Sequence, residues 1–184
     1  MVHIIFESHS TTIDNEAERS SGHYDVELSE LGLKQSKELG ERYSDKHLDA
    51  IYCSDLQRSY KTGEIAFEGR GFQIIRDARL RECDYGDMTQ FPSPMVSAQK
   101  TASILMPFPN GESYSDCINR MGSFLQDILK KHQDNDIIMV IGHRATQYGL
   151  NYWISGHDLT KCVTDKWKWQ PGWNYKLTEL KKHG

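Results

Sequence analysis

The chain has 184 residues, of which 38% are hydrophobic and 26% charged, and this is the length and balance of one soluble globular domain spanning residues 1–184. A net charge of −4 and a pI of about 6.1 argue against a nucleic-acid-binding protein, which usually carries a basic patch. No stretch approaches the ~20 continuous apolar residues of a membrane span, and residues 1–6 lack the basic start of a secretion signal.

The first half of the chain alternates apolar runs with helical patterns. Residues 2–6 are apolar between polar neighbours, which predicts a short buried strand, and a polar loop follows through Gly22. Ser29 is a suitable cap for a helix that reaches about Tyr43. A second strand is predicted over residues 48–53, and a helix is predicted to start at Asp55. Residues 72–75 form a third apolar run.

The second half begins with a stretch, residues 76–94, whose charges, glycine and prolines predict mostly loop. Ser113 is a suitable cap for an amphipathic helix over residues 113–131. Residues 136–142 resemble the fully buried strands of parallel sheets, and a helix is predicted from 144 to 155. The alternating end, residues 167–177, suggests a terminal hairpin around Pro171-Gly172. This order predicts an α/β fold in three layers, with a largely parallel central sheet and helices on both faces.

Chemically useful side chains follow four of the predicted strands. Ligands of open α/β sheets bind beyond the carboxyl ends of the strands, and His9, Arg58, Glu82 and His143 all lie just after a strand or at the helix that follows it. Arg144 stands beside His143 at a predicted helix start, where unpaired N–H groups favour an anion. Two imidazoles, two guanidiniums and a carboxyl group suit a phosphate ester. Taken singly, each of these residues would more often be a packed or solvated side chain.

Six sequence blocks, in order, resemble the histidine phosphatase superfamily, the phosphoglycerate-mutase-like proteins. That family opens with a strand, then Arg-His-Gly-Glu-Thr and an asparagine six residues past the histidine. Residues 6–15 (FESHSTTIDN) keep His9, Thr12 and Asn15 in this register. The other blocks are residues 21–32 (SGHYDVELSELG), 50–59 (AIYCSDLQRS), 79–86 (RLRECDYG), 109–113 (PNGES) and 140–143 (VIGH). The resemblance covers nearly the full length and implies the fold of that family.

The resemblance also implies roles for individual residues. His9 would be the phosphorylated nucleophile, and Arg58 and His143 would hold the phosphoryl oxygens. Glu82 would give a proton to the leaving oxygen and then take one from water. The substrate side would be lined by Asn15, Ser21 and Gly22.

The chain departs from the family pattern around the nucleophile. Ser8 and Ser10 replace the family's arginine and glycine in the sequence Ser8-His9-Ser10. An arginine there would hold phosphate and disfavour an imidazolium, and losing one such contact costs ~2–4 kcal/mol of transition-state stabilisation. The family's usual glycine after the second histidine is Arg144, so we hypothesise that Arg144 supplies the lost guanidinium. Arg19 and Arg81 are weaker candidates.

The sequence therefore predicts a phosphomonoester hydrolase that acts through a phosphohistidine on His9. A phosphoglycerate-type mutase is the first alternative, although residues 91–109 offer the only room for the lid that a mutase needs. A degenerate module that binds phospho-ligands without turnover is the second. A zinc hydrolase using His3, His9 and His143 is the third, and it lacks ligand spacing.

The predicted reaction and the composition also indicate the expected substrate, partners and cellular compartment. The substrate is expected to be a small phosphorylated metabolite, with no metal or organic cofactor required, since arginines and histidines neutralise the phosphate. Neither nucleic acid nor a membrane is expected as a partner, and exposed terminal strands would allow a homodimer. The four cysteines lie far apart in the sequence, which indicates free thiols in a reducing cytoplasm.

Overall fold

A five-stranded sheet forms the centre of the computed structural model, which describes residues 1–182. The strands are β1 (Val2–Ser8), β2 (Ala50–Cys53), β3 (Ile74–Arg76), β4 (Ile137–Gly142) and β5 (Trp173–Leu177), in the order β3-β2-β4-β1-β5. The first four strands are parallel, and β5 runs antiparallel beside β1. The predicted α/β fold with a largely parallel sheet is confirmed.

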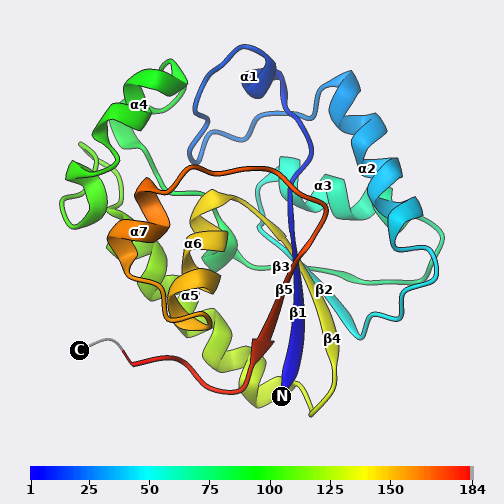
Figure 1. Cartoon of the computed structure of the whole chain (residues 1–184). Coiled ribbons are helices and arrows are strands. Elements are labelled where there is room, and N and C mark those ends of the chain that lie inside the picture. Colours follow the sequence, from blue (N-terminus) through cyan, green and yellow to red (C-terminus); the bar gives the residue numbers. More distant parts are fainter. Residues whose placement is uncertain (183–184) are drawn as a thin grey trace.

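Helices cover both faces of this sheet (Figure 1). The helices are α1 (Ile13–Glu16), α2 (Glu30–Arg42), α3 (Gln57–Ala66), α4 (Ser93–Gln99), α5 (Tyr114–Lys131), α6 (Arg144–Trp153) and α7 (Leu159–Thr164), with short 3-10 turns η1 (Ala78–Leu80), η2 (Gly86–Met88) and η3 (Ala102–Ile104). Leu39 and Phe67 pack from α2 and the end of α3 against one sheet face, while Phe124 and Leu150 pack from α5 and α6 against the other. Two hydrophobic cores therefore hold the sheet between helical layers.

The two long helices start where their capping residues predict. The Ser29 side chain accepts a hydrogen bond from the Gly32 backbone at 3.2 Å. Ser113 accepts one from the Asp116 backbone at 3.1 Å, and the Asp116 carboxylate accepts one from the Ser113 backbone in return. These bonds satisfy N–H groups that the first turn of a helix leaves unpaired.

Two predicted details are wrong. The helix after β2 begins at Gln57 with Leu56 as its N-cap, because the Asp55 carboxylate pairs with the Arg81 guanidinium at 2.6 and 2.7 Å. The terminal hairpin predicted over residues 167–177 is absent. β5 is the only strand in that range, and it pairs with β1. Residues 165–172 instead cross above the carboxyl ends of the parallel strands (Figure 1), and Gly172 turns into β5 with a φ of +70°.

Short helices appear in stretches expected to be loop. The turn α1 is closed by reciprocal bonds between Thr12 and Asn15, and α4 lies in the 91–109 stretch expected to be the only room for a lid. All four cysteines are free and buried, as expected. Over residues 1–182, no helix is both long and apolar enough to span a membrane.

Candidate active site

A pocket of about 600 Å³ opens at the edge of the sheet where the parallel strands end. All nine residues expected at the site from the sequence line this pocket; they are Ser8, His9, Asn15, Ser21, Gly22, Arg58, Glu82, His143 and Arg144. The fold brings them together from four separate strand ends because parallel strands present their carboxyl ends at one edge.

His9 directly follows β1 and is partly buried. Its Nδ1 lies 2.7 Å from the Ser10 carbonyl oxygen, so this nitrogen carries the proton and Nε2 keeps its lone pair. Burial and then the nearby charge of Arg58 lower the pKa of His9 to about 3. The imidazole is therefore neutral at neutral pH, even with Ser8 where the family has arginine.

His143 follows β4 and is 1% exposed. Its ring centroid lies 4.9 Å from that of His9, and its Nε2 is 2.6 Å from the Ser54 hydroxyl. Its Nδ1 is buried with no hydrogen-bond partner among the described residues. Burial, followed by the charge of Arg58, lowers the pKa of His143. A neutral ring with Ser54 donating to Nε2 has its proton on Nδ1, which can then donate to an oxygen of a ligand.

Arg58 lies in the first turn of α3 and is 2% exposed. Two of its nitrogens donate to the carbonyls of Tyr24 at 2.9 Å and Gly22 at 2.7 Å. Gly22 has a φ of +52°, and a Cβ there would lie 3.1 Å from the Tyr85 ring, so the glycine allows this close approach. Asp55, three residues before Arg58, pairs with Arg81 instead.

Glu82 lies in the loop after η1, at the start of α6. One carboxylate oxygen accepts from the backbone of Cys83 at 2.8 Å and of Ala145 at 3.2 Å, and the other from the backbone of Arg144 at 3.3 Å. The Glu82 carboxyl group thus occupies the helix start at which the sequence predicts an anion site. The three bonds fix the carboxyl group in the pocket near His9 and His143.

Arg120 on α5 holds the loop that carries Glu82. Its guanidinium donates to the carbonyls of Arg79, Arg81 and Glu82, each at 2.8 Å. It also binds both carboxylate oxygens of Glu112 at 2.9 Å. This role was not predicted, because a single arginine on an amphipathic helix has the sequence pattern of an ordinary surface residue.

Replacing Arg120 by methionine is expected to lower the free energy of unfolding by ~3 kcal/mol, because Glu112 and three carbonyls lose a partly buried charged partner. Urea denaturation followed by circular dichroism measures this. The matched control is Lys130→Met, whose exposed pair with Asp127 is worth less than about 1 kcal/mol. Equal stability of the two variants would contradict the assigned role of Arg120.

The smaller polar residues of the site are held by local bonds. Ser8 donates to the His9 carbonyl at 3.3 Å, and the Ser10 hydroxyl accepts from Ser36 on α2 at 2.9 Å. Ser21 donates to Asp14 at 2.9 Å. The Asn15 side-chain oxygen accepts from the Thr12 backbone at 3.1 Å, and Asn15 lines the pocket. Ser8 adds no charge where the family has arginine.

The candidates for a replacement guanidinium lie in different places. Arg81 is paired with Asp55, and Arg19 lines the pocket from its exposed rim. The Arg144 guanidinium also lies in the pocket wall, 4.7 Å from the Trp167 ring centroid. The charge that lowers the pKa of His9 is that of Arg58. The hypothesis that Arg144 completes the phosphate clamp stays a prediction.

Three further pocket residues were not predicted from the sequence. Lys100 follows α4, and Trp167 and Trp169 belong to the segment that crosses above the sheet. Only the crossing path of residues 165–172 brings these tryptophans to the site, and no local pattern predicts that path.

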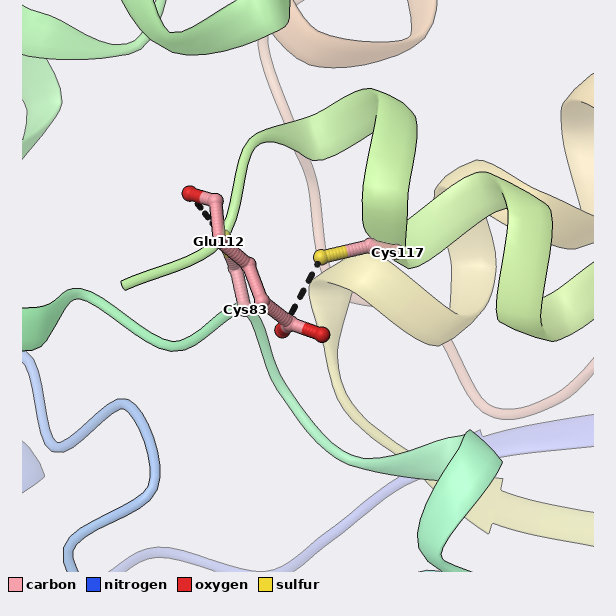
Figure 2. Close-up of side chains that lie close together, drawn as sticks. All are labelled: Cys83, Glu112 and Cys117. Carbon is pink, nitrogen blue, oxygen red and sulfur yellow. Dashed lines mark hydrogen bonds between the residues drawn. The ribbon is translucent and has the colours of Figure 1, made fainter. Parts of the chain in front are cut away.

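A second cluster of ligand-type side chains consists of Cys83, Glu112 and Cys117 (Figure 2). The Cys83 thiol donates to the Glu112 carbonyl at 3.7 Å, and the Cys117 thiol donates to the Glu112 carboxylate at 3.5 Å. Arg120 already supplies the positive charge, since it binds Glu112 and approaches the Cys117 sulfur at 3.4 Å. The hydrogen bond to Cys117 and burial raise the pKa of Cys83. Protonated thiols beside a guanidinium do not suit a metal cation.

The zinc alternative also fails on geometry. His3 pairs with Ile137 at the amino end of β1, and His9 lies six residues further on. Six residues of strand span ~20 Å, whereas ligands of one zinc ion lie within a few ångströms of each other. His3 therefore cannot share an ion with His9 and His143.

The fold and this pocket define an α/β enzyme of phosphate chemistry, with histidines and an arginine at the strand ends. A sequence profile of the histidine phosphatase superfamily (branch 1) matches residues 4–169. The chain belongs to the histidine phosphatase superfamily. Its relatives in this superfamily include phosphatases and mutase-like proteins.

Individual relatives support this placement. Phosphoserine phosphatase 1 of Hydrogenobacter thermophilus is 31% identical over 88% of this chain and 80% of its own length. A probable phosphoglycerate mutase, GpmB of Erwinia tasmaniensis, is 29% identical over 78% of this chain and 70% of its own. The solved structure of YhfR from Bacillus stearothermophilus shares the fold with a TM-score of 0.83 at 22% identity, covering 97% of this chain and 96% of that one.

Proposed function

We propose that the chain hydrolyses small phosphomonoesters through a phosphohistidine on His9, with Glu82 as the general acid and base. The observation that supports this most is the neutral His9 ring, whose Nε2 is free and lies in one pocket with Arg58, His143 and Glu82. These are the groups that an in-line phosphoryl transfer to nitrogen requires.

In the first step, the lone pair of His9 Nε2 attacks phosphorus and forms a P–N bond. The P–O bond to the alcohol breaks, and the protonated Glu82 carboxyl gives its proton to the leaving oxygen. Arg58 and the Nδ1–H of His143 stabilise the negative charge on the non-bridging oxygens.

In the second step, a water molecule gives a proton to the Glu82 carboxylate and attacks phosphorus. The P–N bond breaks, and inorganic phosphate and the neutral imidazole are formed. Glu82 is protonated again at the end, so the cycle needs no other proton donor.

Within the superfamily, the phosphatase is favoured over the mutase. A mutase must cover its phosphoenzyme from water, and the 91–109 stretch supplies only the short elements α4 and η3 for this. Incubation with 3-phosphoglycerate tests the choice: phosphate release is expected, with no conversion to the 2-phosphate isomer. Isomer formation would establish the mutase, and vanadate binding without turnover of any ester would establish the non-catalytic module.

His9 is expected to stay neutral throughout the pH range above its pKa of about 3. Long-range ¹H–¹⁵N NMR should show one neutral ring with the proton on Nδ1. Arg58→Met is expected to raise the pKa of His9, because a neighbouring positive charge disfavours the imidazolium. Since the unfolded chain binds this proton near pH 6.5 and the folded chain does not, His9 contributes stability above that pH that is lost as the pH falls toward 3. A pKa near 6.5 in the wild type would contradict this account of the nucleophile.

The buried free thiols support a reducing cytoplasm as the place where the enzyme works. In this proposal Ser8, Asn15, Ser21, Gly22 and Arg144 form the phosphate- and substrate-binding wall around the reacting groups.

A further inference from the structure

Lys100 and Arg144 are two of the cations that line the pocket. Lys100 is half-buried after α4, and Arg144 opens α6. The Lys100 ammonium donates to the Tyr148 hydroxyl at 3.4 Å, and the Arg144 guanidinium lies over Trp167. Over residues 1–182, neither forms an ion pair, whereas the pocket cation Arg42 binds Glu7 at 3.4 Å.

The two cations act on each other. Burial and then the charge of Arg144 lower the pKa of Lys100, while the charge of Glu82 raises it. Like charges in a partly buried wall repel each other, and this repulsion is relieved when an anion lies between them. Trp167 limits the freedom of the guanidinium, because its Nε1 is fixed to the Gln147 side chain at 2.8 Å.

The position of Lys100 and Arg144 indicates which half of the substrate they contact. Glu82 must contact the oxygen that leaves, and the Glu82 carboxylate accepts from the backbone N–H of Arg144 itself. The part of the substrate joined to that oxygen must therefore extend past the start of α6. Arg144 opens α6, and Lys100 lies close enough for its pKa to respond to the charges of both Arg144 and Glu82. Arg58 is instead bound to the 22–24 loop.

We propose that Lys100 and Arg144 form a second anion site, which binds a carboxylate or a second phosphate on the alcohol half of the substrate. The inference rests on the proposed phosphatase function and names the substrate class: a phosphomonoester whose leaving alcohol carries another negative group. Arg144 then determines specificity through the leaving group and does not replace the lost family arginine.

Matched substrates test this site. O-phosphoserine and O-phosphoethanolamine differ only in a carboxylate, and the mono- and bisphosphates of propane-1,3-diol differ only in a phosphate. The wild type is expected to prefer the extra anion by about tenfold or more in kcat/KM, the size of one charge-assisted hydrogen bond. The pair of substrates with the larger preference identifies the anion as carboxylate or phosphate.

The double variant K100M/R144Q is expected to reduce this preference to about onefold, with most of the change in KM, and Arg144→Lys should retain part of it. The exposed Lys37→Met is the matched control and should keep the full preference. The absence of a preference in the wild type would overturn the inference. An equal loss on both members of a pair would also overturn it and would assign Arg144 to the phosphate clamp.

A binding measurement separates this inference from the proposed reaction. Titration calorimetry compares 2-amino-4-phosphonobutyrate with 3-aminopropylphosphonate, and propane-1,3-bisphosphonate with propylphosphonate, none of which can be hydrolysed. Tighter binding of the anion-bearing member by the wild type, with no such difference in K100M/R144Q, supports the anion site. If this result is obtained and no ester is hydrolysed, only the phosphatase proposal fails. Turnover combined with equal binding within both pairs overturns the anion site alone.

Discussion

His9→Ala is expected to lower kcat on any phosphomonoester by at least about 10⁴-fold, because the proposed covalent intermediate forms on the His9 imidazole. Arg58 and His143 would still hold the phosphate, so KM should change far less than kcat. Steady-state kinetics with an aryl phosphate measure both constants. The exposed histidine variant His157→Ala is the control and should behave as the wild type.

The intermediate itself provides a more direct test. Rapid acid-free quenching of the wild type during turnover, followed by mass spectrometry, should find one phosphoryl group on the peptide that contains His9. No such peptide should form in His9→Ala. A phosphorylated peptide elsewhere in the chain, or undiminished turnover by His9→Ala, would disprove the nucleophile.

Glu82→Gln is expected to show an effect that depends on the leaving group. With an alkyl phosphate, kcat should fall by ~10²–10⁴-fold, the range for loss of a general acid, because an alkoxide is a poor leaving group without a proton. With 4-nitrophenyl phosphate the first step should be nearly unaffected, since nitrophenolate leaves without help. The amide keeps the size of the side chain and can still accept from the backbone of α6.

The second step also loses its base in this variant. Stopped-flow traces with 4-nitrophenyl phosphate should therefore show a burst of one nitrophenolate per active site, followed by slow turnover as the phosphohistidine accumulates. Glu68→Gln, at an exposed position, should show neither effect. An equal loss with alkyl and aryl substrates would mean that Glu82 is not the proton donor.

Much of the site could be predicted from the chain itself. Strand periodicity and capping residues placed β1, β4 and α5, and these elements are local in sequence. The residues His9, Arg58, Glu82 and His143 each follow a strand, and parallel topology brings such positions to one edge. The sequence motifs at the strand ends therefore predict a shared pocket.

Other features depend on contacts between distant segments. The pairing of β5 with β1 replaced the predicted hairpin, and the same crossing segment delivers Trp167 to Arg144. The roles of Arg120 and Lys100 depend on neighbours 38 to 48 residues away in the chain. Side-chain period and capping report only local conformation, so the sequence alone determined most of the elements and the candidate site residues. The tertiary structure decided which charges are paired, which are left for a ligand, and how His9 stays neutral without the family's arginine, because these properties arise from burial and from long-range packing.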